Sequence, residues 1–528
     1  MKTMRYLFAF LILNVFSVSC ELLSGDNGTN DENHEQQGPE DGPEDKHFGC
    51  VLEFPAEGVT DENFLAFCIN LTHEYKYEFQ GLDNCSWVRI CNIQNVDGHD
   101  WMPYITVDPN ATGSQRSVEV VAIYNQSVCC RHTIVQKPGD IRKRCMPKVY
   151  IETPDAAEIV SKETWISDAV IKVYDEYGDL DLSTQTDIRG RGNSTWGYPK
   201  KPYALKLNSK EQVLGMPKHK RWVLLANWMD RTLLRNDVAF GLGRRTMAWA
   251  PRGRFVELYL NGVHKGNYYL CEHIKVDSGR VDIAELDEDS DFSDAGQVTG
   301  GYILEFDVYG PNDEINYFYS HVKNYPVAIK EPDEDVITSW SHPGYLYIKE
   351  YIGEVERVLE EDKSARSRWK EIESLIDVTS YIDWWLVHEV CINGEPGHPK
   401  SSYMYKDRNG KLYAGPLWDF DWGTFTPGVN GAIIARTLWY GYLFEYPEFK
   451  AAVKTRWGEV KSVYESVGAY IDDQAEALRE SNEVNINMWP ITQVVNGDES
   501  MSYDQAITRM KDAFNHRISS IDTYIRTL

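Results

Sequence analysis

The sequence predicts an α+β protein, in which a small all-β module precedes a large domain whose strands come first and whose helices come later. Short, alternating β-branched runs, such as SVEVVAIY and RHTIVQ, lie before residue 140. Beyond residue 147, strand and hairpin signals give way to long helical stretches. With 528 residues, 42% of them hydrophobic, the chain is long enough for two or three domains with substantial cores.

Residues 1–20 are typical of an export signal. Lys2 and Arg5 precede an apolar run from Tyr6 to Phe16 that is too short to span a bilayer, and small residues then lead to Cys20. The SVS before Cys20 resembles a bacterial lipobox, which would make Cys20 the lipidated first residue of the mature protein. An ordinary cleaved signal with a chance cysteine is the alternative. We therefore expect an exported lipoprotein at the outer membrane or cell surface, or one facing the periplasm, with a lipid anchor as its only membrane contact.

Residues 21–47 are acidic and rich in Gly and Pro, so they cannot bury enough apolar surface to fold and are predicted to be a flexible tether. The all-β pattern follows over residues 48–140. Here WMPYITVDPNATGSQRSVEVVAIYN and RHTIVQKPGD resemble a BACON-type immunoglobulin-like module, and the resemblance implies a small β-sandwich. That family is associated with carbohydrate or mucin contact. A plain spacer sandwich is the alternative that we favour.

Seven of the ten cysteines crowd between residues 50 and 145. In an exported protein such crowding predicts disulfides, although the sequence does not fix their pairing. Cys271 and Cys391 lie in apolar runs and are predicted to be buried thiols.

The formal net charge of −27 argues against nucleic acid as a partner, because such binding needs a basic surface. An anionic ligand would need a local basic pocket on this acidic protein.

The large domain is predicted to cover residues 147–528. YALKL and GYILEF are typical of strands, and FVELYLNGVHKGNYYLCEHI contains two strands joined by Asn261-Gly262, the strongest short-range hairpin signal. WVLLANWMDRTLLRNDVAF predicts a buried strand, a turn and a helix that carries Arg235. Later helices are predicted from Tyr345 to about Leu375, from Val378 to about Ile392, and after Glu448.

The stretch DIRGRGNSTWGYPKKPYALKL is a candidate anion-binding hairpin. Arg189 and Arg191 alternate with glycines, and a basic strand containing Lys206 follows. Glycines let backbone N–H groups approach an anion closely, while Arg and Lys supply charge. The spacing matches neither a Walker loop nor a dinucleotide fingerprint, and a tight hairpin turn is the alternative.

Asp419 and Asp421 lie one residue apart in the apolar run LWDFDWGTF. Two unpaired carboxylates in apolar surroundings repel each other and are costly to bury. Carboxylate oxygens are the ligands that Mg²⁺ prefers, so the pair is predicted to hold a metal ion. The alternative is a structural pair that caps backbone groups or contacts an arginine.

Six stretches together resemble the CotH family, a group of spore-coat protein kinases: RGNSTW, KKPYALKL, WVLLANWMDRTLLRN, ELYLNGVHKGNYYLCEHI, GGYILEFD and WDFDWG. They cover most of residues 150–425 in the family's order. The resemblance implies an atypical protein-kinase-like domain that uses ATP and Mg²⁺, with Asp419 and Asp421 as metal ligands. The nucleotide-binding residues that it implies are Arg189, Arg191, Asn193, Lys206, Arg235 and Glu272.

The loop INGEPGHPKSSYMY departs from the family's catalytic loop. Glu395 occupies the position of the catalytic Asp, and Ser401 or Ser402 falls near the position of a metal-binding Asn. The resemblance implies catalytic roles for Glu395 and Asp419, in phosphoryl transfer from ATP to Ser or Thr of a protein or to another surface acceptor. The alternative is an inactive, pseudokinase-like surface lipoprotein that binds glycan or protein.

Overall fold

The structure is a computed structural model that describes residues 49–54, 56, 77–82, 85, 87–94, 101–110, 112–139, 144–308 and 316–528. It divides into two compact units, Met1–Lys143 and Arg144–Leu528. With 31% helix and 28% strand, it confirms the mixed α+β class. The predicted signal, Cys20 and the tether lie outside the described residues. No helix within these ranges is long and apolar enough to cross a membrane.

The described part of the first unit is built from strands. One sheet has the order β1-β6-β5-β2, and a separate antiparallel pair consists of β3 and β4. The predicted strands in SVEVVAIY and RHTIVQ are β5 and β6, which form an antiparallel hairpin. The β-sandwich and its BACON likeness stay predictions. The strands are β1 (Gly49–Phe54), β2 (Glu78–Gln80), β3 (Val88–Gln94), β4 (Trp101–Val107), β5 (Arg116–Tyr124) and β6 (Ser127–Gln136).

The cysteine predictions have two outcomes. Cys85 and Cys145 are free thiols, so the predicted disulfides are wrong for these two residues. Cys271 and Cys391 are buried thiols, as predicted. Burial raises the pKa of both, which makes them poor nucleophiles.

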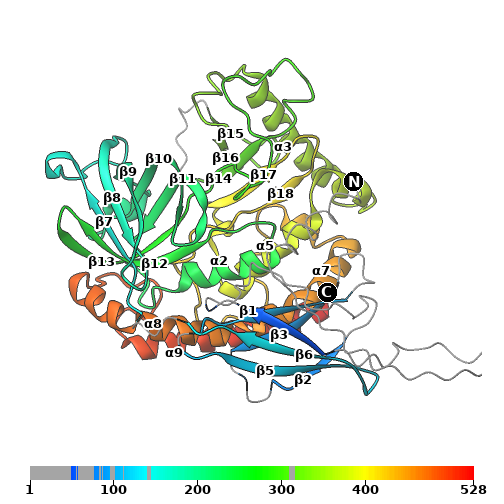
Figure 1. The fold of residues 1–528 in the computed structure, drawn as a ribbon. Helices are drawn as coiled ribbons and strands as arrows, with labels where there is room; N and C mark the ends of the chain where they lie inside the picture. The colour runs from blue at the N-terminus through cyan, green and yellow to red at the C-terminus, as the bar shows by residue number, and fades with distance from the viewer. Residues whose placement is uncertain are drawn as a thin grey trace, which may run out of the picture. The chain divides into compact units, whose positions relative to one another are not determined.

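The second unit begins with a closed seven-stranded barrel in the order β10-β11-β13-β12-β7-β8-β9 (Figure 1). Alternate residues of each strand, such as Leu205 and Leu207, fill the barrel interior, while their neighbours face outward. The strands are β7 (Lys148–Glu152), β8 (Ile166–Tyr174), β9 (Leu180–Gly190), β10 (Tyr203–Val213), β11 (Met216–Leu225), β12 (Gly253–Leu260) and β13 (Val263–Glu272).

The Asn-Gly hairpin is confirmed. β12 and β13 are antiparallel neighbours, and the two residues between them, Asn261 and Gly262, have φ values of 49° and 73°. Positive φ at both central positions is the geometry of a type I′ turn, whose twist matches that of the flanking strands.

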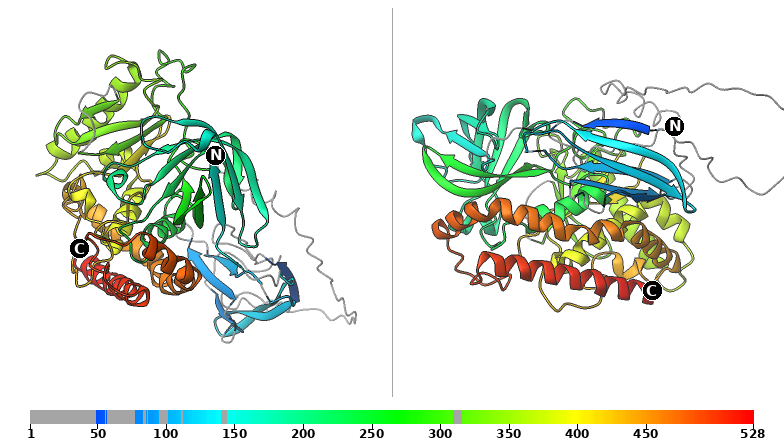
Figure 2. Two further views of the ribbon diagram at one scale, coloured as in Figure 1. Left: turned by 90° about the vertical axis from the view of Figure 1, so that its left-hand side faces the viewer. Right: turned by 60° about the horizontal axis from the view of Figure 1, so that its bottom comes forward.

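A second sheet and eight α-helices complete the described part of this unit. The sheet order is β15-β16-β14-β17-β18. Helices α8 and α9 lie side by side (Figure 2), and α8 also contacts β13 of the barrel. The elements are α2 (Arg235–Thr246), β14 (Tyr302–Phe306), β15 (Tyr317–Tyr319), β16 (Pro326–Glu331), α3 (Pro343–Glu361), α4 (Trp369–Leu375), α5 (Val378–Cys391), β17 (Ser402–Lys406), β18 (Leu412–Ala414), α6 (Tyr440–Leu443), α7 (Pro447–Glu465), α8 (Val467–Met488) and α9 (Tyr503–Thr527), with short 3-10 turns at Pro154–Ala156, Ser194–Gly197 and Glu395–Gly397.

The helix predicted from Tyr345 to about Leu375 is wrong as a single element. The chain instead forms α3 and α4, with a break that begins at Asp362. The Asp362 carboxylate accepts hydrogen bonds from the backbone nitrogens of Ser367 and Arg368, at 2.8 Å for each nearest oxygen. These bonds replace the helical ladder, because a short acidic side chain competes well for free N–H groups.

We expect the two units to melt separately. The hydrophobic clusters of the described residues are each confined to one unit. Residues 144–528 produced alone should therefore fold, and their calorimetric transition should coincide with one of two transitions of the full chain. A single cooperative transition of the full chain, together with failure of the fragment to fold, would contradict this expectation.

Candidate functional site

The two aspartates predicted as metal ligands form a close pair after β18. Asp419 has a φ of 64°, an uncommon backbone conformation for a residue with a side chain. Its carboxylate forms a hydrogen bond with that of Asp421. Burial, followed by the charge of Asp419, raises the pKa of Asp421 well above its usual range. The two carboxylates therefore repel each other when both are ionised, and a bound cation would relieve this repulsion.

Three asparagines from distant parts of the chain fix the backbone of this pair. Asn236, on α2, accepts a hydrogen bond from the nitrogen of Phe420 at 2.8 Å. Asn393, after α5, donates to the carbonyl oxygen of the first aspartate at 3.1 Å. Asn496, between α8 and α9, donates to the carbonyl oxygen of the second aspartate at 3.0 Å and accepts from the nitrogen of Gly423 at 2.8 Å. The sequence analysis missed these roles, because no local pattern marks an asparagine that acts across such separations.

Glu395 lies in the loop after α5 and faces the same region. Its carboxylate is 8% exposed, and Oε1 lies 2.5 Å from Nζ of Lys400. Oε2 is buried and accepts no hydrogen bond from the residues that the structure describes. Burial, and then the charge of Asp419, raises the pKa of Glu395 to about 8. A carboxyl group tuned in this way can exchange a proton near neutral pH.

Ser401 takes the position at which the sequence analysis sought a metal-binding amide. Its hydroxyl donates to Oδ2 of Asp419 at 3.3 Å. The backbone of Ser401 also has a positive φ, 48°, so the loop is held in an unusual conformation beside the aspartates. A serine hydroxyl orients this carboxylate but offers a weaker metal ligand than an amide oxygen.

The Gly-rich hairpin reaches the aspartate pair through two side chains. The guanidinium of Arg191 lies 5.2 Å from the ring centre of Trp418, next to Asp419 in the chain. The hydroxyl of Tyr198 is close enough for both aspartates to raise its pKa, although burial is the larger cause. The region around residue 191 thus lies beside the carboxylates, as an anion-binding hairpin requires.

The other predicted residues of this hairpin and strand point elsewhere. Arg189 stacks on Trp165, with its guanidinium 4.5 Å from the ring centre, and donates to the carbonyl oxygen of Glu163 at 3.3 Å. Asn193 is exposed and begins a 3-10 turn without capping it. Lys206 is exposed on the outward face of the barrel. The contacts that these three side chains make with the described residues do not bring any of them to the aspartates.

Arg235 and Glu272 are held in buried ion pairs. Arg235 lies between the carboxylates of Asp230 and Asp498, and all three side chains are at most 1% exposed. Glu272 receives two hydrogen bonds from the Arg252 guanidinium, at 3.0 and 3.1 Å. The charges of both predicted nucleotide-binding residues are thus balanced by ion pairs within the protein, which gives these residues structural roles.

A family profile described as CotH kinase protein matches residues 188–521, more than half of the chain. The chain belongs to this family. The match begins inside β9, so β7 and β8 of the CotH barrel precede it although they close the same sheet. Every predicted site residue except Cys20 falls within the matched range. No curated protein matches the chain.

The aspartate pair of the CotH domain is the candidate site for a metal ion. Within the described ranges, no group of three or more His, Cys, Asp or Glu side chains is arranged to hold one. Mg²⁺ does not require such a group, since it is commonly bound by one or two carboxylates together with substrate phosphates and water. Two hydrogen-bonded carboxylates, with a serine hydroxyl on one of them, fit this mode of binding.

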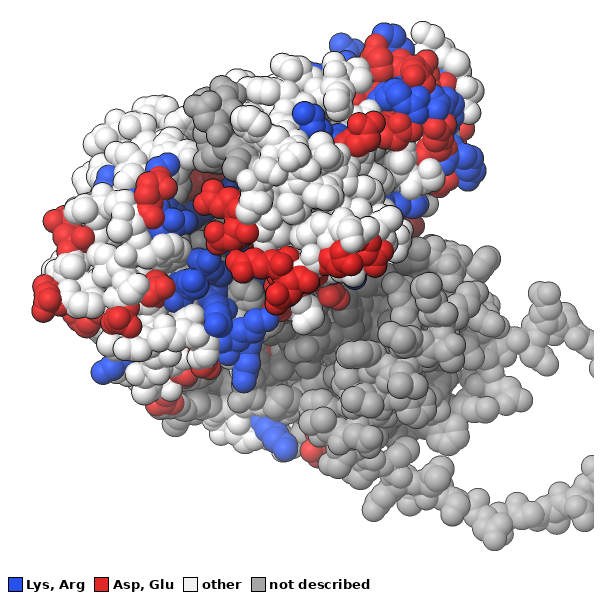
Figure 3. All heavy atoms as spheres, turned by 90° about the horizontal axis from the view of Figure 1, so that it is seen from above, with Lys and Arg blue, Asp and Glu red and all other residues white. Residues whose placement is uncertain are grey.

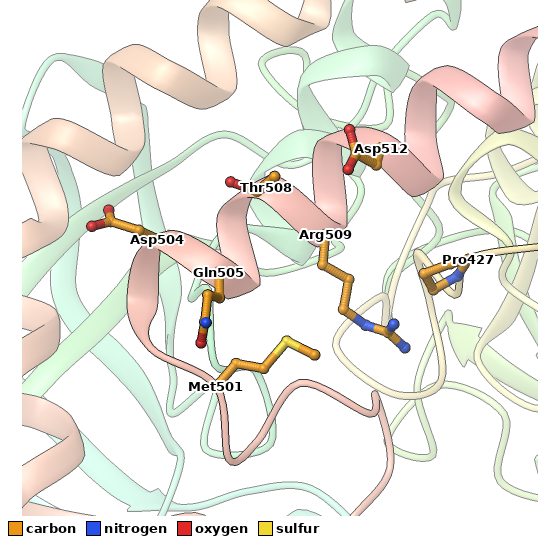
Figure 4. A pocket seen from close by; sticks show the side chains of 7 residues that line it. All are labelled: Pro427, Met501, Asp504, Gln505, Thr508, Arg509 and Asp512. Carbon is orange, nitrogen blue, oxygen red and sulfur yellow. The ribbon is translucent and has the colours of Figure 1, made fainter.

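A hollow of about 570 Å³ lies along α9 of the CotH domain (Figure 4). Arg509 extends from the helix toward the loop that contains Pro427, while Asp504 and Asp512 point from other parts of the helix. Arg509 also donates to the carbonyl oxygen of Asn496 at 3.3 Å. None of the predicted site residues lines this hollow.

Proposed function

We propose that this protein is a magnesium-dependent kinase that transfers a phosphoryl group from ATP to a serine or threonine hydroxyl of a protein, or to another surface acceptor. The observation that carries the proposal is the pair of hydrogen-bonded aspartates beside Arg191 and Glu395. Family membership supports kinase chemistry in general.

The side chains would divide the work as follows. Asp419 and Asp421 would hold Mg²⁺, which neutralises phosphate charge when bound. Arg191 would contact phosphate oxygens from the barrel side. Glu395 would orient the acceptor hydroxyl and accept its proton, and Lys400 would keep the Glu395 carboxylate in place. Ser401 would hold Oδ2 of Asp419 in its ligating orientation.

A calorimetric titration with Mg²⁺-ATP tests the site without knowledge of the acceptor. We expect binding with Mg²⁺ and much weaker binding when the metal is chelated. Metal binding at neutral pH should also release protons, because a ligating carboxylate must lose its proton. Equal affinity with and without metal would contradict the proposal.

Glu395 supplies a pH-dependent prediction. A general base acts in its ionised form, so the transfer rate should rise with pH around a midpoint of about 8 and level off above it. Glu395→Gln should remove this rise and lower the rate by about 10²–10⁴-fold. Lys400 lowers the pKa of Glu395, so Lys400→Met should move the rise to higher pH. Measured pH–rate profiles check both variants, and Lys370→Met, at an exposed lysine on α4, is the control. A profile unchanged in all three variants would remove Glu395 from the mechanism.

An inactive, pseudokinase-like lipoprotein that binds glycan or protein is the second candidate. Two observations favour it. Ser401 lies near the position where the family has a metal-binding Asn, and the Glu395 carboxylate is already paired with Lys400. Single-turnover incubation with radiolabelled ATP separates the two functions. Binding of Mg²⁺-ATP without transfer to any acceptor, water or the protein itself would favour the inactive form.

The pattern of residues 1–20, which predicts an export signal, supports the proposal of a lipid anchor at Cys20. We expect Cys20→Ser to move the protein from the membrane fraction to the soluble fraction of the producing cell, because the lipid would have no attachment point. Cys145→Ser, which replaces a free thiol, is the matched control and should stay with the membrane. Pelleting of Cys20→Ser with membranes would contradict lipid anchoring.

A further inference from the structure

A cavity of about 230 Å³ lies at one edge of the barrel in the second unit. Its walls come from β10, β11, the segment after β13, and the ends of β14 and β16. Four lining side chains are cationic and two are acidic: Lys210, Lys220, Arg221 and Lys275, with Glu285 and Glu331. None of the residues assigned above to phosphoryl transfer lines it.

Two of the four cations are held in ion pairs, and the other two are not. Lys275 pairs with Glu331, and Lys210 pairs with Asp277 at 2.5 Å. Lys220 and Arg221 form no ion pair with any residue that the structure describes. The charges of Glu331, Asp333 and Asp187 act on Arg221 from beyond ion-pair distance, but burial and the charge of Arg189 outweigh them and lower its pKa. Figure 3 shows that, on the face seen from above, Lys and Arg side chains gather in one group beside a row of Asp and Glu.

Further cations crowd the same face of the barrel. In the ladder, Lys206 lies directly opposite Arg221, so both side chains leave the same face of the sheet. Arg189 and Arg221 share the ring of Trp165, at 4.5 and 5.4 Å from its centre. Burial, and then the charge of Arg189, lowers the pKa of Arg221. Like charges held together in this way are stabilised by a bound anion.

His219 adds an uncharged donor to the cavity wall. Its Nδ1 accepts a hydrogen bond from the backbone nitrogen of Arg221 at 2.8 Å. Burial, and then the charge of Arg280, lowers the pKa of His219 to about 3, so the ring is neutral at pH 7. A neutral ring whose Nδ1 accepts carries its proton on Nε2, which is then a donor.

We propose that this cavity is a second anion site, which binds a phosphate group through Arg221, Lys220 and the Nε2–H of His219. A guanidinium, an ammonium and a neutral N–H donor complement the oxygens of a phosphate group. The volume is below the about 300–1,000 Å³ of pockets that enclose drug-sized ligands, so a single phosphate group suits it better than an entire nucleotide. None of its lining residues belongs to the aspartate site, and the proposal does not depend on catalysis there.

The test is a titration of the full chain with inorganic phosphate, at constant ionic strength maintained with chloride, followed by calorimetry and by the melting temperature. We expect saturable binding and a rise in melting temperature with phosphate only. Lys220→Gln and Arg221→Gln should each weaken binding about tenfold or more, because each removes a charge-assisted hydrogen bond. Lys220 is exposed, so its replacement should not unfold the protein.

Two controls separate this site from the aspartates and from general charge effects. Lys172→Gln removes an exposed lysine elsewhere on the barrel and should bind phosphate as the parent does. Asp419→Asn should also bind phosphate normally, even if it loses Mg²⁺-ATP binding. Equal weakening by Lys172→Gln, an equal response to chloride, or full phosphate binding by Lys220→Gln and Arg221→Gln would overturn the proposal.

The same titration with glycerol phosphate identifies the source of the phosphate group. Tighter binding of this monoester than of inorganic phosphate, again weakened by Lys220→Gln, would show that the site takes a phosphate carried on a larger molecule. Tighter binding of inorganic phosphate would show that the free ion is the ligand. Both results support the anion site and differ only in what delivers the anion.

Discussion

Asp419→Asn is expected to abolish Mg²⁺-dependent nucleotide binding while leaving the metal-free fold as stable as before, or more stable. The substitution removes one of the two carboxylates that hold the metal, and loss of such charge stabilisation lowers reaction rates by about 10²–10³-fold or more. It also ends the repulsion with Asp421. The melting temperature with and without Mg²⁺-ATP measures both effects.

The pH dependence of stability gives this prediction a second readout. Because the pKa of Asp421 is raised in the folded protein, the folded state keeps a proton that the unfolded state releases above its ordinary pKa. The contribution of Asp421 to the stability of the metal-free protein is therefore lost progressively as pH rises above that ordinary value. Asp419→Asn should flatten this loss, and Asp472→Asn, at an exposed aspartate of α8, should not. A destabilised Asp419→Asn variant that keeps the full shift with Mg²⁺-ATP would refute the metal site.

Arg517→Met is expected to cost about 3–5 kcal/mol of folding free energy, the typical loss when a buried ion pair is broken on one side. Arg517 and Glu389 are paired with both side chains fully buried. The same carboxylate accepts hydrogen bonds from the nitrogens of Ile433 and Ile434, at 2.9 Å for each nearest oxygen. The substitution would leave Glu389 buried without its counter-ion, and it would loosen the segment that follows the aspartate pair.

Denaturant unfolding of the 144–528 fragment measures this cost. Arg526→Met is the matched control, because it removes an arginine from the same helix whose pair with Asp522 is exposed and contributes about 0–1 kcal/mol. The double variant Glu389→Gln/Arg517→Met should recover part of the loss, since neither charge then remains unpaired. If Arg517→Met loses no more folding free energy than Arg526→Met, water must solvate Glu389 in place of the lost guanidinium. An additive double variant would mean that the two residues act independently.

The sequence by itself determined the features that depend on local chemistry. The α+β class follows from hydrophobic periodicity, and the β12–β13 hairpin follows from two residues that accept positive φ. The aspartate pair was predictable because two carboxylates in an apolar run require a partner wherever the chain places them. The buried thiols at Cys271 and Cys391 followed from their apolar neighbours in the same way.

Only the tertiary structure decided which charges meet. Arg189 and Arg191 look equivalent in the sequence, yet one stacks on Trp165 and the other lies beside Trp418. Arg235 looked like a phosphate ligand until Asp498, more than 260 positions later, was found to pair with it. The partners of a charge are chosen by the packing of distant elements, and burial multiplies the strength of each contact. Composition and spacing indicate neither the partner of a charged side chain nor its burial. The residue types of the site could therefore be predicted from the sequence, whereas the contacts of its arginines could not.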